Sequence, residues 1–158
     1  MTEFKITNWA GSEWTEDAVK KPEPLSPGEY DLRIIDATFD PDTERYQIIV
    51  QDVITLAESR FSWFIKTKAG GLNPYSHGTL VSLGKALFGR DVGVPFYEDV
   101  INGIVHAEVV QGKEFIREDG STGHYLSIYS FKPIQSDVYD LVRDSGYPVI
   151  AQHTEAVQ

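Results

Sequence analysis

A short basic and aromatic segment is the part of this sequence best suited to bind a ligand. The segment, RFSWFIKTKAGG, runs from Arg60 to Gly71 and places cations on both sides of three aromatic rings. Between Glu58 and Asp91 there are five basic side chains and no acidic ones, although the whole chain carries a net charge of -10. Aromatic rings stack on nucleobases and cations contact phosphates, so this composition is typical of a surface that binds single-stranded nucleic acid.

The alternation of side chains along a strand divides this segment into two faces. Phe61 and Trp63 lie on the wholly apolar face, which we expect to enter the core. Phe64 then points outward, where it can stack on a base, unless a bulge in the strand inverts the two faces. Together with outward positions on other strands, this parity predicts the nucleic-acid-binding residues Arg45, Arg60, Phe64, Lys66, Lys68, Tyr125 and Tyr129.

Five strands and one helix are expected to position these residues. Alternating apolar residues predict strands over 30–39, 45–54, 58–67, 103–112 and 124–131. Leucines at helical spacing predict a short helix that ends at Gly89, between the third and fourth strands. This order predicts an all-β fold with a small α contribution: a five-stranded OB-like barrel, in which strands two and three often bind oligonucleotides.

The chain of 158 residues is expected to form one domain with two flanking segments. Residues 1–28 are acidic and then proline-rich, which predicts an extended arm. Residues 29–134 form the predicted domain, and residues 135–158 form a tail with one or two helical turns. We find no apolar run of membrane-spanning length and no secretory signal, so we expect a cytoplasmic protein.

Catalytic and metal-binding signatures are not readable in the sequence. The segment DPDTER lacks the glycine and the final glutamate of a calcium loop. The four histidines have no metal-ligand spacing, and the chain contains no cysteine, phosphate-binding loop or nucleophile elbow. We therefore expect a protein that is not an enzyme and that uses no cofactor or metal.

Three segments resemble a family of phage-encoded proteins, some of which bind single-stranded DNA. They are NWAGSEW with PLSPGEYDLRIID, then NPYSHGTLVSLGKALFG, and finally VINGIVHAEVVQGKEF with GHYLSIYSFKP. The resemblance implies an OB-like fold and protection or presentation of single strands during phage replication or recombination, in the host cytoplasm. It also implies replication or recombination proteins as partners. The chain departs from bacterial single-stranded-DNA-binding proteins at its end, HTEAVQ, which lacks their acidic tip with a closing Pro-Phe.

The net charge leaves a second interpretation open. An acidic protein-interaction or virion-assembly module, acting as a nucleic-acid mimic, would use the acidic surface in place of the basic segment. A small hydrolase is a third interpretation. The sequence leaves open the choice of DNA or RNA, the length of the binding site, the oligomeric state and the protein partners.

Overall fold

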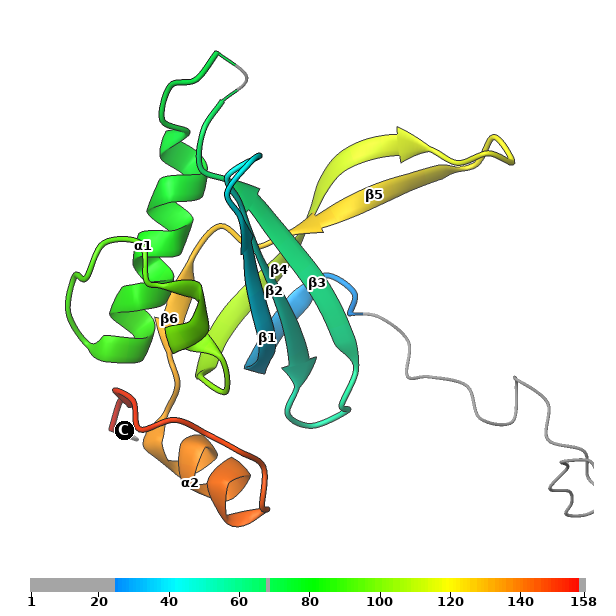
Figure 1. Ribbon diagram of the computed structural model, residues 1–158. Coiled ribbons are helices and arrows are strands. Elements are labelled where there is room, and N and C mark those ends of the chain that lie inside the picture. The colour runs from blue at the N-terminus through cyan, green and yellow to red at the C-terminus, as the bar shows by residue number, and fades with distance from the viewer. Residues whose placement is uncertain (1–24, 68, 157–158) are drawn as a thin grey trace, which may run out of the picture.

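The computed structural model describes residues 25–67 and 69–156, which form an antiparallel β-sheet with two α-helices (Figure 1). The strands lie in the order β3-β2-β1-β4-β5, and β6 pairs with β4. In chain order the elements are β1 (Gly28–Asp40), β2 (Arg45–Asp52), β3 (Glu58–Phe64), α1 (Pro74–Phe88), the 3-10 helix η1 (Tyr97–Val100), β4 (Ile104–Ile116), β5 (Thr122–Ser127), β6 (Phe131–Pro133) and α2 (Ser136–Asp144). The predicted all-β class with a small helical contribution is confirmed.

The sheet is open and has six strands, so the prediction of a closed, five-stranded barrel is wrong. The predicted strand over 124–131 is divided into β5 and β6, and the chain between them bonds to α1. The hydroxyl of Thr79 donates to the carbonyl of Tyr129 (2.9 Å), and the amide of Phe131 donates to the hydroxyl of Ser82 (2.9 Å). These bonds hold the segment against the helix, and within the described residues β3 and β5 are not paired.

A bulge in β1 changes which residues of that strand face the core. The register against β2 shifts between Ile34 and Asp36, which leaves Ile35 as an extra residue. Leu32 and Ile34 are buried before the bulge, and Ala37 is buried after it. The apolar positions change parity at the same point, so the bulge keeps both halves of the strand in contact with the core.

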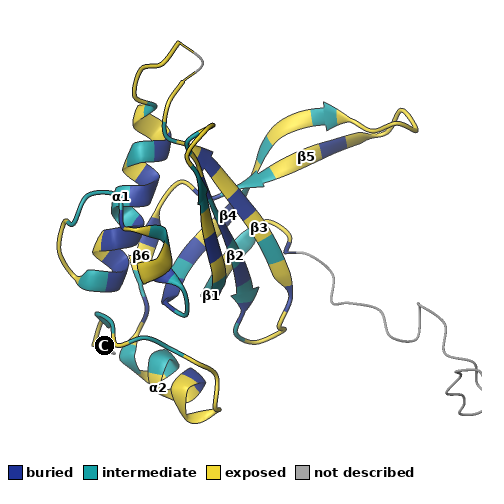
Figure 2. Ribbon diagram, in the orientation of Figure 1, coloured by how far each residue is buried: buried dark blue, intermediate teal, exposed yellow. Residues whose placement is uncertain are grey.

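The main core lies between α1 and the inner face of the sheet, where Figure 2 shows buried positions alternating along the strands. α1 begins at Asn73, whose side chain accepts hydrogen bonds from the amides of Tyr75 and Ser76. It ends at Gly89, which has φ of 75° and donates its amide to the carbonyl of Lys85. The predicted helix and its end are confirmed. Its buried residues are Ser76, Thr79, Leu80, Leu83, Gly84, Ala86 and Leu87.

The segment after residue 134 contains α2 and returns to one end of the sheet (Figure 1). Val142 of α2 packs with Ile104 and Ile134 in a second, smaller core. The side-chain amide of Gln152 donates to the carbonyl of Ile104, and its oxygen accepts from the amide of Ile104, both at 2.7 Å. In the part of the chain that the structure describes, no helix is long and apolar enough to cross a membrane.

Trp63→Ala should lower the free energy of unfolding by about 3–5 kcal/mol, as expected when a buried aromatic ring is truncated. The indole is 9 % exposed and its ring lies 5.9 Å from that of Phe131, so alanine would leave a cavity. Urea unfolding measures the change. Phe64→Ala is the control, because Phe64 is 49 % exposed, and it should cost less than about 1 kcal/mol. Equal losses in the two variants would contradict the assignment of the faces.

Candidate nucleic-acid interface

The outer face of β2 and β3 carries three of the predicted binding residues. β3 pairs with β2 without a register shift from Glu58 to Phe64, so no bulge inverts its faces. Trp63 is buried and Phe64 is exposed, which confirms the predicted parity. Arg45 lies directly opposite Phe64. Arg60 lies on the same outer face of β3, four residues before Phe64. The structure therefore places an exposed aromatic ring directly opposite one cation, with a second cation four residues away on the same surface.

Polar side chains complete this outer face between the two arginines. The hydroxyl of Ser62 donates to the side-chain oxygen of Gln47, its cross-strand partner, at 3.1 Å. Arg60 lies opposite Ile49, which is half-buried. The ring of Phe64 remains exposed beside these side chains. Arg60 forms no ion pair with a described residue.

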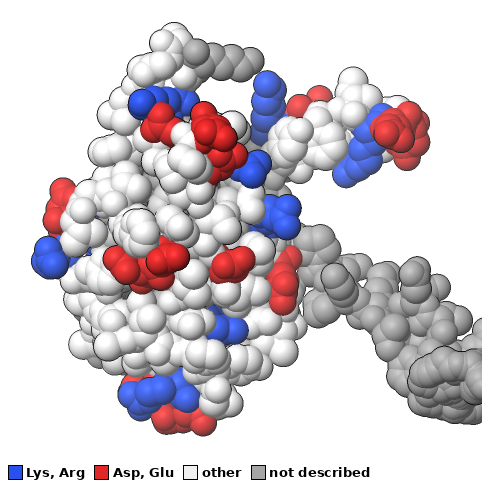
Figure 3. Space-filling model, viewed as in Figure 1, with Lys and Arg blue, Asp and Glu red and all other residues white. Residues whose placement is uncertain are grey.

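Acidic side chains from neighbouring parts of the chain lie next to the basic side chains of this surface. Asp40 of β1 lies opposite Arg45 in the sheet, and the pKa of Asp40 is lowered by a hydrogen bond from the amide of Asp42 and, more weakly, by the charge of Arg45. Lys66 lies just beyond β3, with its Nζ 2.8 Å from Oε2 of Glu44. Acidic and basic side chains accordingly lie next to each other on the face seen in Figure 3. A segment without acids in the sequence does not produce a surface without acids.

A groove follows the free edge of β3, which pairs with no strand among the described residues. It has a volume of about 140 Å³ and lies between Ser62 and Trp63 of β3, the start of α1 and the chain after β5. Two exposed tyrosines, Tyr75 and Tyr129, lie on its rim. Tyr129 was predicted from the alternation of the last strand. Tyr75 was missed, and its signal in the sequence is its place in the first turn of a helix that begins at Asn-Pro.

Tyr125 lies apart from this surface, on the β4–β5 hairpin that extends away from the body of the protein (Figure 1). Its ring centroid is 4.6 Å from that of Phe115, and the guanidinium of Arg117 lies 5.4 Å from the centre of the Phe115 ring. Gly123 makes this stack possible, because a Cβ atom there would lie 2.7 Å from the Phe115 ring. The sequence analysis missed Phe115, which lies directly opposite Gly123, and Arg117, which is two residues further along the chain.

The seventh predicted residue, Lys68, lies outside the described residues. The structure therefore brings together Arg45, Arg60 and Phe64, places Lys66 and Tyr129 at the two borders of that surface, and separates Tyr125 from it. The described residues contain no cluster of three His, Asp or Glu side chains able to hold a metal ion.

A charged cluster occupies the outer face of β1 and β4. His106 lies between two carboxylates, with Nδ1 2.9 Å from Asp31 Oδ1 and Nε2 2.8 Å from Glu29 Oε1. Partial burial lowers the pKa of His106, but hydrogen bonds to Glu29 and Asp31 outweigh it, so the pKa is raised overall. The hydrogen bond and charge of His106 in turn lower the pKa of Glu29. Both ring nitrogens face acceptors, so the cluster favours the imidazolium form.

No protein-family model matches this chain, and no curated protein matches it significantly. The function is therefore inferred from the residues and their geometry.

His106→Gln should destabilise the fold more at about pH 5.5 than at about pH 8.5. A pKa that is raised on folding contributes stability fully below the ordinary value of 6.5, and that contribution is lost as the pH rises through the raised value. Urea unfolding of both proteins at both pH values measures the difference. His77→Gln, on α1 and without a carboxylate in salt-bridge distance among the described residues, should show no such pH dependence. A larger loss at the higher pH would contradict the stabilising role of the imidazolium.

Proposed function

We propose that this chain is a single-stranded-DNA-binding protein that protects or presents single strands, as in phage replication or recombination. The observation that carries the proposal is the outer face of β2 and β3, where Phe64 is exposed directly opposite Arg45 and on the same face as Arg60. A base can stack on the ring while the two guanidinium groups contact the phosphates on either side. The proposed role is binding and not catalysis.

The strand order supports the proposal. The order β3-β2-β1-β4-β5 is that of an OB barrel opened between β3 and β5, with α1 following β3 as it does in that fold. OB folds bind oligonucleotides on the face of their second and third strands. Three of the seven residues predicted from the sequence, Arg45, Arg60 and Phe64, lie on the β2 and β3 face here.

Further aromatic rings offer a path for more than one base. Tyr75 and Tyr129 border the groove at the free edge of β3, and Tyr125 stacks with Phe115 on the hairpin. Stacking contributes about 1–3 kcal/mol per base and tolerates any sequence, because every base has an aromatic face. Paired bases in a duplex are not available to such rings, so exposed rings favour single strands.

The carboxylates near the site limit the electrostatic attraction. Arg45 and Lys66 lie close to Asp40 and Glu44, so phosphate must compete with these acids. We expect binding to depend more on stacking and less on charge than in a strongly basic protein. The net charge of -10 also opposes nonspecific coating of duplex DNA.

Titration of the protein with oligo-dT and with a duplex of equal length should show tighter binding of the single strand. With about three phosphate contacts, from Arg45, Arg60 and Lys66, the log-log salt slope should be near -2, at about 0.7 per contact. The oligonucleotide should be recovered intact after incubation with divalent ions. Equal affinity for the duplex would reject selective binding of single strands. No binding at low salt would reject DNA binding and favour the acidic protein-interaction alternative.

Phe64→Ala should weaken oligo-dT binding by about 1–3 kcal/mol, because the stacking platform is lost. The control is Phe96→Ala, since Phe96 is 56 % exposed but lies outside the proposed surface, beside Tyr97. For charge, Arg60→Ala should reduce the magnitude of the salt slope, whereas Arg143→Ala on α2 should not. Fluorescence anisotropy at several salt concentrations measures all four variants. Equal effects of Phe64→Ala and Phe96→Ala would place the binding surface elsewhere.

A further inference from the structure

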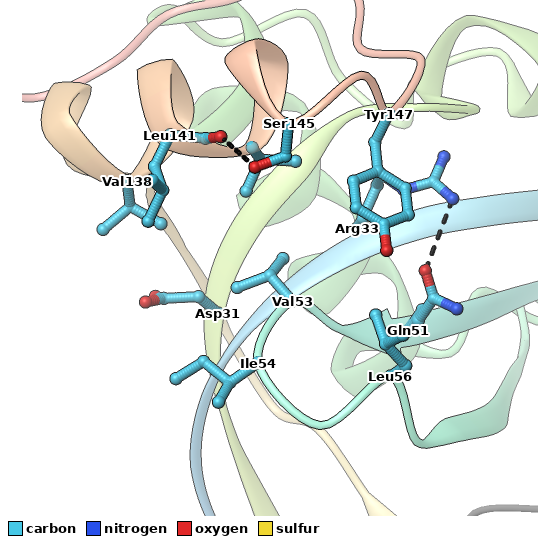
Figure 4. A pocket seen from close by; sticks show the side chains of 11 residues that line it. Asp31, Arg33, Gln51, Val53, Ile54, Leu56, Val138, Leu141, Ser145 and Tyr147 are labelled. Atoms are coloured by element: carbon cyan, nitrogen blue, oxygen red, sulfur yellow. Dashed lines mark hydrogen bonds between the residues drawn. The ribbon is translucent and has the colours of Figure 1, made fainter.

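A separate cleft lies between α2 and the turn that joins β2 to β3 (Figure 4). Its volume is about 270 Å³, large enough for one or two large side chains. One wall is formed by Val138 and Leu141 of α2, and the other by Val53, Ile54 and Leu56 of the turn. The cleft is thus apolar on both sides. It shares Gln51 with the outer face of β2, but none of the residues proposed to contact DNA lines it.

The apolar residues at the rim of this cleft are not covered by any described residue. Ile54 is 82 % exposed, and Leu141 and Leu56 are also exposed. Single exposed apolar side chains are ordinary, but a group that lines one cleft is typical of a surface that binds another molecule. Each wall is thereby left with apolar area that a ligand could bury.

One end of the cleft contains an arginine with unused hydrogen-bond donors. Nη1 of Arg33 donates to Asn102 Oδ1 at 2.9 Å and to the Pro148 carbonyl at 3.3 Å, and Nη2 donates to Gln51 Oε1 at 3.4 Å. These acceptors are all neutral, and Arg33 forms no ion pair with a described residue. Of its five N–H groups, that on Nε and one on Nη2 have no acceptor in the described chain.

The unused donors of Arg33 fit a carboxylate. Nε and Nη2 are neighbours on the guanidinium plane, an arrangement that can hold the two oxygens of one carboxylate. The ring of Tyr147 lies 5.4 Å from the guanidinium carbon, and both residues line the same side of the cleft (Figure 4). A chain that enters along the apolar walls therefore reaches Arg33 beside Tyr147.

Asp31 is the second charged side chain that lines the cleft. Asp31 and Arg33 are two residues apart on β1, so their backbones are separated by roughly 7 Å, the length of two extended residues. One oxygen of Asp31 faces His106, whose raised pKa favours the cation, so the negative charge of Asp31 is partly compensated. An N–H group two residues before a terminal carboxylate could donate to the second oxygen of Asp31.

We propose that this cleft binds the carboxyl end of a partner protein, with one or two large apolar side chains between its walls and the terminal carboxylate on Arg33. The occupant is a peptide and not nucleic acid, because the walls are aliphatic and α2 carries the carboxylates of Asp140 and Asp144 against the one cation that pairs with them, Arg143. The inference stands independently of DNA binding, since it uses none of the residues proposed for that surface.

The test uses the full chain and the peptide N-acetyl-Gly-Ser-Gly-Ser-Leu-Phe, prepared as the free acid and as the terminal amide. Amide resonances of residues 53–56 and 138–147 should shift in two-dimensional NMR spectra as the acid is added. The acid should bind roughly ten-fold more tightly than the amide, the difference expected for a charged hydrogen bond. Arg33→Lys should remove most of this difference, because lysine lacks the planar fork.

Ile54→Ser should weaken binding of the acid by roughly ten-fold, because a buried aliphatic contact is lost. Ile116→Ser is the matched control: Ile116 is 77 % exposed, against 82 % for Ile54, but lies on the β4–β5 hairpin. Both positions are on the surface, so these variants should fold even if Arg33→Lys does not. The proposal is overturned by equal binding of acid and amide, by equal effects of the two isoleucine variants, by absence of binding at about 5 mM peptide, or by self-association of the chain through this cleft.

Discussion

The first strand must hydrogen-bond to different neighbours along its two halves, and the rest of the sheet depends on how it does so. Residues 28–33 pair with β4 on one edge and residues 32–40 pair with β2 on the other, so Leu32 and Arg33 pair with both strands. Next to this overlap, the amide of Ile34 donates to the carbonyl of Gly103, and its carbonyl accepts from the amide of Asn102. If β1 paired regularly through Ile35, with no bulge, the polar side chains of Asp36 and Thr38 would face the core. The bulge therefore keeps apolar side chains on the core face along the whole strand.

The register set beyond this bulge determines the composition of the candidate interface. β1 places Asp40 opposite Arg45, and β2 places Arg45 opposite Phe64. The same pairing that brings a cation to the exposed ring therefore also brings a carboxylate to that cation. The site is a mixed surface in which one aromatic ring is accessible, and its selectivity for single strands would come from that ring and not from net charge.

Local features of the fold were predictable from the sequence, because each depends on neighbouring residues. The parity of Trp63 and Phe64 follows from the alternation of one strand, and α1 follows from leucine spacing between Asn73 and Gly89. The open sheet was not predictable, because it depends on the bonds of Thr79 and Ser82 to a segment about fifty residues later in the chain. The acids beside the basic segment were missed for the same reason, since Asp40 comes from β1 and Glu44 from the turn that follows it.

The open sheet also has a consequence for the behaviour of the protein in concentrated solution. Every second residue of β3 turns its N–H and C=O groups away from β2, and these groups can pair with any extended chain that approaches. Such an edge is a template for aggregation unless side chains oppose it. The charges of Glu58 and Arg60 on this strand provide that opposition, and the strand is only 7 residues long. Replacing these charges by apolar residues would therefore affect solubility before it affects folding.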